Sequence, residues 1–278
     1  MIKNNEYTII NQKIKKETKI ALLSDIHFSK QLNQKYQTQI LENLQKNHPD
    51  IICICGDIMD SNNEVKSQNS QEELKQFLTK ISQISPIVMV YGNHDEVKRT
   101  GRKEKKGSKK YLKEIVKEIP HCTLLDNEKA TIKSINFYGI YLPYSYYYNK
   151  KHREDPTILK KYYQELQISS SKHYQILLCH TPLLLHQLKH SNIDLILSGH
   201  THNGLMPTWI ENRIQNTRGL LSPNLRLFPN YTRGKTKYKH TIHIISGGII
   251  KLSRISTPLS FINFLFRPHI EYITLKKS

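Results

Sequence analysis

Side chains that bind metal ions or transfer protons gather at five places along this chain. They occur as Asp25-Ile26-His27, as the runs GDIMD at 56–60, GNHD at 92–95 and GHTH at 199–202, and as the single His180. Carboxylates, imidazoles and amides are ligands for divalent metals, and a free imidazole also transfers protons near neutral pH. The residue types therefore indicate metal-assisted catalysis.

An apolar run precedes each of these places: KIALLS, IICIC, IVMVY, YQILLC and IDLILS. Short runs rich in Ile, Val and Leu that end in Gly or Asp are typical of buried strands. Open α/β folds bind ligands just beyond the carboxyl ends of their strands, so we expect the polar clusters to meet at one edge of a sheet. Each motif alone is more often a turn or a helix cap. The order of all five together indicates a site.

The set contains more ligands than one ion can use. The candidates are Asp25, His27, Asp57, Asn93, His180, His200 and His202. Nitrogen and oxygen donors without cysteine favour Mn, Fe or Zn over a sulfur-bound structural zinc, and the share of nitrogen is too high for calcium. Two ions sharing one carboxylate would use the whole set. Such a pair, about 3.5–4 Å apart, can activate a bridging water and clamp the oxygens of an in-line phosphoryl displacement.

Helical and apolar patterns alternate through the first two-thirds of the chain, which predicts an α/β fold with helices outside. Helices are expected at 34–47, 71–84, 108–119 and 156–168, with a short one at 183–188, and strands at 123–142. The last 60 residues favour strands and loops, which suggests a second sheet packed on the first. No linker divides the chain, so residues 1–278 are expected to form one domain with a β-rich part at about 205–278.

The chain is strongly basic, with 42 Lys and Arg against 23 Asp and Glu and a net charge of +19. Such an excess attracts polyanions, which include phosphorylated substrates, anionic lipid headgroups and nucleic acid. A generally Lys- and Asn-rich proteome would give the same composition. A basic insertion at about 98–110 follows GNHD directly, so it is expected either to steer an anionic substrate or to be a solvated loop.

The chain has no run of the ~18–20 apolar residues that a membrane-spanning helix needs, and the N-terminal residues lack the pattern of a signal peptide. We therefore expect a cytoplasmic protein. The apolar and basic C-terminal part suggests peripheral contact with the inner face of an anionic membrane. The four cysteines, Cys53, Cys55, Cys122 and Cys179, are expected to be reduced, and the three that lie in strand runs to be buried.

In this order, the motifs DIH, GDIMD, GNHD, CH and GHTH closely resemble those of the calcineurin-like metallophosphoesterase superfamily, over about residues 19–204. The resemblance implies a four-layer αββα sandwich, made of two mixed β-sheets flanked by helices, with a binuclear metal centre. The runs ALLSD and LSGHTHNG look most like the bacterial membrane-associated phosphodiesterase branch, which includes hydrolases of lipid-linked pyrophosphates.

By this resemblance the ligands divide between two metals. Asp25, His27 and His202 would hold the first metal and Asn93, His180 and His200 the second, with Asp57 bridging both. His94 would be the catalytic histidine near the leaving-group oxygen. Asp60 would orient His94 through its other ring nitrogen, and Asp95 would cap the following turn.

Two departures from the family pattern concern substrate recognition. Asn203, Gly204 and Leu205 follow GHTH where the branch commonly has two glycines and a glutamine. Ser61 replaces an Arg that often follows GDxxD in protein phosphatases, which argues against a phosphoprotein substrate.

We therefore predict a hydrolase of phosphodiester, phosphomonoester or pyrophosphate bonds that uses a metal-bridging hydroxide. The alternatives are a DNA or RNA nuclease on the same scaffold, which the positive charge and the basic insertion favour, and a non-catalytic binding scaffold. The second alternative conflicts with the complete ligand set.

Overall fold

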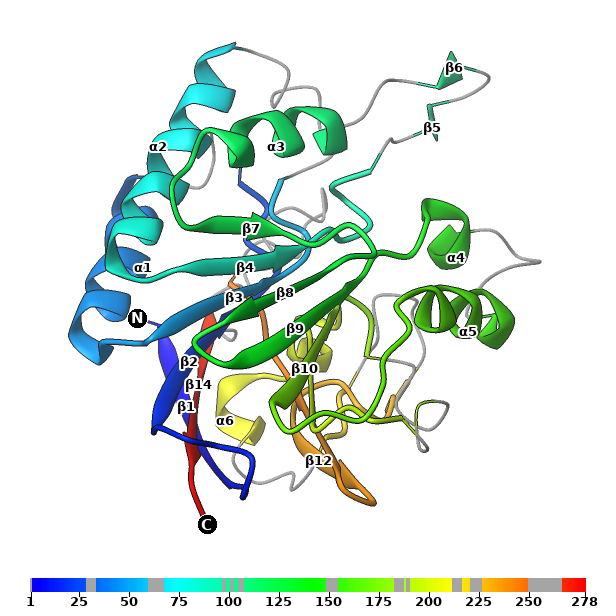
Figure 1. Ribbon diagram of the computed structural model, residues 1–278. Coiled ribbons are helices and arrows are strands. Elements are labelled where there is room, and N and C mark those ends of the chain that lie inside the picture. Colours follow the sequence, from blue (N-terminus) through cyan, green and yellow to red (C-terminus); the bar gives the residue numbers. More distant parts are fainter. Residues whose placement is uncertain are drawn as a thin grey trace.

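The computed structural model describes residues 2–28, 34–59, 68–96, 99–100, 103–104, 108–148, 155–182, 188, 191–211, 217–220, 227–249 and 267–278. Two six-stranded sheets pack face to face, and helices cover their outer faces (Figure 1). The expected four-layer αββα arrangement is confirmed. No helix in the described part of the chain is long and apolar enough to cross a membrane.

The first sheet has the strand order β1-β14-β2-β3-β4-β7. Its strands are β1 (Lys3–Ile10), β14 (His269–Lys276), β2 (Thr18–Leu23), β3 (Ile51–Cys55), β4 (Ile87–Val90) and β7 (Cys122–Leu124). Strands β2, β3, β4 and β7 run parallel, so their carboxyl ends lie along one edge. Strand β14 pairs antiparallel with β2 and parallel with β1, so the first and last strands of the chain lie side by side (Figure 1).

The second sheet has the strand order β12-β13-β11-β10-β9-β8. Its strands are β12 (Gly234–Tyr238), β13 (Thr241–Ile245), β11 (Leu195–Ser198), β10 (Tyr174–Cys179), β9 (Ile135–Ile140) and β8 (Lys129–Ile132). The four central strands are parallel, and β12 and β8 close the edges as antiparallel hairpins. The second sheet therefore begins in the middle of the chain rather than in its C-terminal part, and β14 returns to the first sheet.

The central strands are buried on both faces, which explains why they appear in the sequence as continuous apolar runs. In β2, Ile20 and Leu22 face the other sheet while Ala21 and Leu23 face the helices, because successive side chains of a strand point to opposite faces. Cys53 and Cys55 likewise point into the core between the sheets. The described cysteines are free thiols, as expected.

Among the described residues, three helices pack on the first sheet and two on the second. Helices α1 (Gln34–Asn47), α2 (Gln68–Ile84) and α3 (Ser108–Lys117) pack on the first sheet, and α4 (Tyr144–Tyr148) and α5 (Pro156–Glu165) on the second. The Asp155 side chain accepts a hydrogen bond from the Thr157 N–H and caps α5, with Pro156 at its first position. The helix expected at 183–188 falls largely outside the described residues.

The basic insertion is described only in part. It contains the short pair β5 (Arg99–Thr100) and β6 (Lys103–Glu104), and it ends in α3. Lys109, at the start of that helix, forms a 2.9 Å ion pair with Asp126, and its ammonium lies over the rings of Tyr91 and Tyr141. This lysine therefore anchors the helix instead of reaching toward a substrate.

Candidate metal centre

The expected ligands all follow the carboxyl ends of parallel strands. Asp25 and His27 follow β2, Asp57 follows β3, and Asn93 follows β4 in the first sheet. In the second sheet His180 follows β10, while His200 and His202 follow β11. Backbone hydrogen bonds hold neighbouring loops together, including Asp25 N–H to Gly56 O (3.1 Å) and Gly199 N–H to His180 O (2.9 Å). The two sheets thus present their polar loops at a common end.

Many of these residues have an unusual backbone conformation. Positive φ angles occur at Asp25 (53°), His27 (45°), Asp57 (50°), His200 (72°) and His202 (46°). This left-handed region is uncommon for residues with a Cβ, although Asp and His enter it more readily than most. It turns the chain sharply at the strand end, so side chains that would otherwise follow the strand point toward one another. Such conformations cluster at functional sites.

Glycines allow the loops to approach closely. A Cβ on Gly92 would lie 2.2 Å from Oδ1 of Asp57, and one on Gly56 would lie 2.5 Å from Nδ1 of His180. A Cβ on Gly199 would likewise lie 2.7 Å from Oδ2 of Asp25. The glycines that introduce three of the motifs are therefore required because a larger residue would displace a neighbouring ligand side chain.

Asp57 lies at the middle of the cluster and is 1% exposed. Its Oδ2 is 3.1 Å from Nε2 of His180 and 3.6 Å from Nε2 of His27, while Oδ1 accepts the His94 N–H at 2.8 Å. Burial opposes its charge, but the adjacent His180 and His94 hold the pKa of Asp57 well below its usual range. The carboxylate therefore stays ionised and can face cations from both sides.

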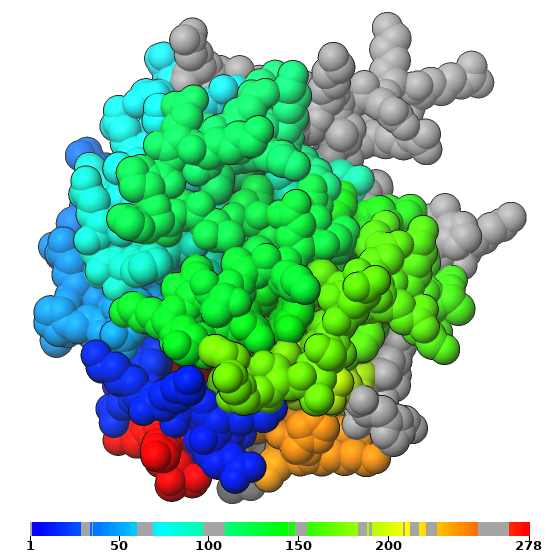
Figure 2. Space-filling model, viewed as in Figure 1, coloured from blue at the N-terminus to red at the C-terminus, as the bar shows by residue number. Residues whose placement is uncertain are grey.

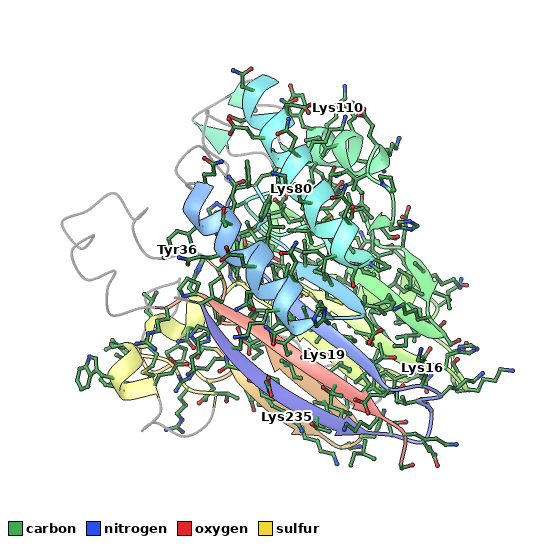
Figure 3. The ribbon with its side chains drawn as sticks, turned by 90° about the vertical axis from the view of Figure 1, so that its left-hand side faces the viewer. Lys16, Lys19, Tyr36, Lys80, Lys110 and Lys235 are labelled. Atoms are coloured by element: carbon green, nitrogen blue, oxygen red, sulfur yellow. The ribbon has the colours of Figure 1, made fainter. Side chains whose placement is uncertain are left out.

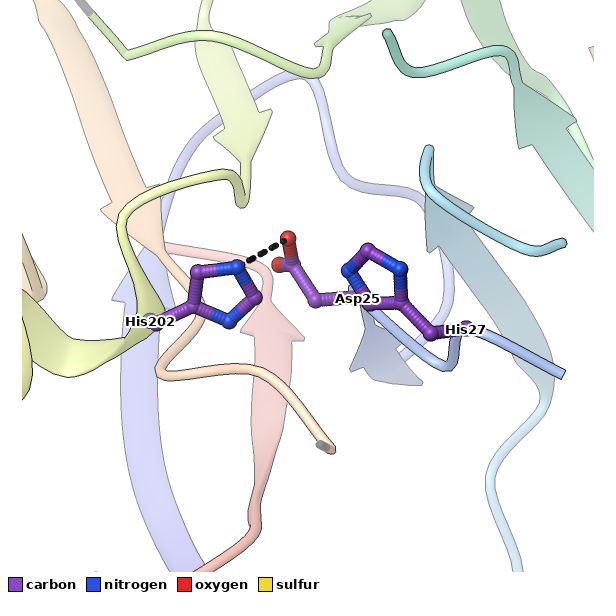
Figure 4. Close-up of side chains that lie close together, drawn as sticks. All are labelled: Asp25, His27 and His202. Carbon is purple, nitrogen blue, oxygen red and sulfur yellow. Dashed lines mark ion pairs between the residues drawn. The ribbon is translucent and has the colours of Figure 1, made fainter. Parts of the chain in front are cut away.

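Asp25 lies between the rings of His27 and His202 (Figure 4). Its Oδ1 is 3.7 Å from Nε2 of His202, and Oδ2 accepts the His200 N–H at 3.0 Å. The buried Oδ1 has no hydrogen-bond donor among the described residues. A buried carboxylate oxygen without a donor is costly, and a cation at this position would satisfy it.

Three imidazoles of the cluster are either neutral, as a metal ligand must be, or can lose a proton to a bound metal. Burial, together with neighbouring imidazoles, holds the pKa values of His27 and His200 well below the usual value, so both are neutral. Burial has the same effect on His180, but the Asp57 carboxylate outweighs it and raises the pKa of His180 to about 9. Because a divalent cation competes with that proton, metal affinity at His180 is expected to rise with pH.

The orientation of the His180 ring is fixed by its surroundings. Its Nδ1 lies 2.7 Å from the carbonyl oxygen of Cys55, to which it donates, so Nε2 faces Asp57. A hydrogen bond of this kind orients the ring and increases its basicity as a ligand.

Three groups of described side chains could hold a metal ion, since their ligand atoms lie within 4.8 Å of one another. They are Asp25-His27-His202, His27-Asp57-His94 and Asp57-His180-His200. His27 and Asp57 each belong to two groups, which is the pattern that two adjacent ions with shared ligands would require. Asn93 is buried beside them, with 2% of its surface exposed.

Two further residues at the site had a different or no role in the sequence analysis. Asp95, expected to cap a turn, accepts hydrogen bonds from the N–H groups of Gly92 (2.8 Å), Met59 (2.8 Å) and Ile58 (3.2 Å), and so joins two ligand loops. Burial and the charge of Asp57 raise its pKa to about 7. The centroid of the Tyr147 ring lies 5.2 Å from that of the His200 ring, so this buried tyrosine belongs to the wall of the site. Asp60 lies outside the described residues.

The chain is similar in sequence to known proteins. A family model described as calcineurin-like phosphoesterase matches residues 18–204. An uncharacterized metallophosphoesterase of Helicobacter pylori strain J99 is 31% identical over 206 residues, which cover 73% of this chain and 49% of that protein. A relative of the same description from Bacillus subtilis is 28% identical over 198 residues, covering 68% of this chain and 63% of its own length. The chain thus spans about half the length of the Helicobacter relative.

Among solved structures, that of TT1561 from Thermus thermophilus superposes with a TM-score of 0.49 at 11% identity. The superposition covers 84% of this chain and 90% of that one.

Proposed function

The chain belongs to the calcineurin-like phosphoesterase family, and from that premise we propose that it hydrolyses phosphodiester, phosphomonoester or pyrophosphate bonds at a binuclear metal centre. The observation that carries this proposal is that Asp57 belongs to two of the three groups of described side chains that could hold a metal ion. Two divalent ions held there would supply an activated bridging hydroxide as nucleophile and would polarise the phosphoryl oxygens.

We assign the ligands to two positions, and two of the three groups support the assignment. Asp25, His27 and His202 would hold one ion, and Asn93, which is buried beside the cluster, would hold the other together with His180 and His200, with Asp57 shared by both. The Asp25 oxygen that lacks a donor and the buried Nε2 of His180, which faces Asp57, support this assignment. Nitrogen and oxygen donors suit Mn, Fe or Zn.

His94 is proposed as the residue that handles the proton of the leaving group. Its backbone N–H donates to Oδ1 of Asp57, the centroid of its ring lies 4.7 Å from that of the His27 ring, and its side chain is partly exposed. It is therefore close to the metal ligands but open to a substrate. An imidazole so placed can give a proton to a departing oxygen or stabilise the phosphoryl group. The role of Asp60 in orienting His94 remains a prediction.

The substrate is proposed to be an anionic phosphate compound because of the charge of +19. The same charge would suit a nuclease, whose affinity for single-stranded nucleic acid would fall steeply with salt. Peripheral contact with an anionic membrane and a cytoplasmic location stay predictions.

Substitution of Asp57 and His94 tests the proposal. Asp57→Asn and His94→Ala are each expected to lower the rate of bis-p-nitrophenyl phosphate hydrolysis with added Mn²⁺ by at least about 100-fold, a loss typical for removal of a group that stabilises transition-state charge. Matched controls are Asp155→Asn, at the cap of α5, and His173→Ala, which bonds the Ser134 carbonyl. Full activity in the Asp57 variant would refute the assigned bridge, and full activity in the His94 variant the assigned proton transfer.

A further inference from the structure

A second concave site lies at the opposite end of the sheets from the metal centre. It is a recess of about 320 Å³ formed by residues 13–18, the turn at 133–135, Asp50 and Tyr174. These residues precede or begin β2, β9, β3 and β10, whereas the metal ligands follow the other ends of β2, β3 and β10. Since β10 has six residues, roughly 20 Å separates the two sites at ~3.3 Å per residue. Figure 2 shows the N-terminal segment, in blue, beside the green and yellow-green segments of the second sheet.

The recess carries positive charge that the surrounding carboxylates do not neutralise. Lys13 donates to both oxygens of Asp194 at 2.9 Å, and Lys133 lies 3.2 Å from Asp50. Glu17, which also lines the recess, lies 3.4 Å from Lys276. Lys15 and Lys16 line the recess and are exposed, and although the charge of Lys16 acts on Asp50, neither lysine forms an ion pair within 4.0 Å with another described residue. Two ammonium groups on consecutive residues are thus available to an anion.

A residue in the wall of this recess also carries a buried donor. Tyr174 lines it and is 1% exposed, yet its hydroxyl has no hydrogen-bond partner among the described residues. Burial and the charge of Asp194 raise the pKa of this tyrosine, so it keeps its proton and remains a donor. Asp194 itself is already bonded to Lys13 and to the Gln175 N–H. An unmade hydrogen bond at a buried hydroxyl is costly, and a ligand oxygen would complete it.

We propose that this recess binds a small phosphorylated ligand, with Lys15 and Lys16 contacting its phosphate and the Tyr174 hydroxyl donating to one of its oxygens. The volume of about 320 Å³ exceeds that of a single phosphate ion and lies at the lower end of the range of small-molecule sites. Ile14 and Ile135, which also line the recess, offer apolar contact to the carbon part of the ligand. The site is separate from the metal centre and does not depend on its chemistry.

Lysine acetylation mapped by mass spectrometry on the full chain tests the location, with inorganic pyrophosphate and AMP as probes. Either probe is expected to slow acetylation of Lys15 and Lys16 at least about fivefold, a difference of about 1 kcal/mol. Lys80 and Lys235, which Figure 3 places away from Lys16, should be unaffected. Sodium chloride at the same ionic strength should not protect any of them. Equal protection of all four lysines, or protection by salt alone, would mean general charge screening and overturn the proposal.

Titration calorimetry on the metal-loaded protein tests the stoichiometry. The double variant Lys15→Ala/Lys16→Ala should lose one equivalent of pyrophosphate binding, and Lys80→Ala/Lys235→Ala should keep it. Tyr174→Phe should weaken that equivalent about fivefold, as the loss of one hydrogen bond predicts. Asp57→Asn should leave it intact even if binding at the metal centre fails, so the two proposals are tested separately. Protection of Lys15 and Lys16 by phosphatidylglycerol vesicles but not by pyrophosphate would assign the surface to lipid headgroups and refute a soluble ligand.

Discussion

Asp95 offers the sharpest test of how the site is held together. It is fully buried, its Oδ1 accepts the Met59 N–H, and its Oδ2 accepts those of Gly92 and Ile58. In Asp95→Asn, one of the two oxygens becomes an amide NH₂, which cannot accept a hydrogen bond. If the amide keeps its oxygen toward Gly92 and Ile58, the Met59 N–H faces another donor. The opposite orientation leaves two N–H groups without an acceptor.

The expected cost follows from this count. One buried N–H without a partner costs about 1–3 kcal/mol. Part of that is offset, because burial and Asp57 raise the pKa of Asp95 to about 7 and its negative charge is itself unfavourable there. We expect Asp95→Asn to lower the free energy of unfolding by about 1–2 kcal/mol. Asp95→Ala removes all three acceptor contacts and should cost about 3–5 kcal/mol.

Urea unfolding followed by circular dichroism at pH 7 measures both variants, in metal-free and metal-loaded protein. Asp155→Asn is the matched control, because Asn caps a helix about as well as Asp, and it should change stability by less than about 0.5 kcal/mol. Since Asp95 positions the Asp57 loop, kcat/KM should also fall in its two variants but not in the control. An Asn variant as stable and as active as the wild type would refute the view that Asp95 joins the loops.

Three further outcomes are expected. Chelation of bound metals should leave the protein folded but lower its melting temperature by roughly 5–10 °C, since a ligand at 1,000 times its Kd adds about 4 kcal/mol to the free energy of unfolding. Unfolding on chelation, seen by circular dichroism, would instead show that the protein folds only with its metals. Gly92→Ala should reduce both metal affinity and activity, because its Cβ would lie 2.2 Å from Oδ1 of Asp57. The control Gly234→Ala changes a residue with a φ of 75° in open surroundings, so it should reduce only the free energy of unfolding, by about 1 kcal/mol. Burial raises the pKa of Glu271 to about 7. In the wild type, the stability that its protonated form contributes is therefore present at low pH and is lost as the pH rises from about 4.5 to 7. Between pH 5 and 8, the free energy of unfolding of Glu271→Gln should thus rise by about 2–3 kcal/mol relative to that of the wild type, and parallel pH profiles in urea unfolding would contradict this.

The strands that position the site were predictable because they are buried on both faces. A run such as IICIC is stable in an α/β fold as a central strand covered on both faces, and the polar residue after it then lies at the edge of the sheet where the strands end. Pairing between distant segments was not predictable in the same way. Strand β14 has a clear strand pattern, but nothing local shows that Leu275 pairs with Thr18 in the first sheet. The pairing of such a strand depends on which sheet edge the rest of the fold leaves open.

The contacts that refine the site also lay beyond sequence reasoning. Asp95 occurs next to His94 and has the spacing of a turn cap, yet its acceptors serve N–H groups 36 and 37 positions earlier in the chain. Tyr147 lies in a Tyr-rich segment to which the sequence analysis gave no role, and only the packing of α4 on the second sheet brings it to His200. A helical repeat of apolar residues would have indicated that Tyr147 is buried, but α4 has only five residues and is too short to show such a repeat.

The backbone strain at the site must be offset by stabilising contacts elsewhere in the molecule. Residues held at positive φ cost of order 1 kcal/mol or more each, and five of the proposed ligands are so held: Asp25, His27, Asp57, His200 and His202. A sum near 5 kcal/mol is comparable to the whole stability of many domains, so the strands that precede these residues must supply the compensation. Those strands, β2, β3 and β11, are buried almost throughout. The ligands are therefore placed by the core before any ion binds, which is why a chelated protein is expected to stay folded.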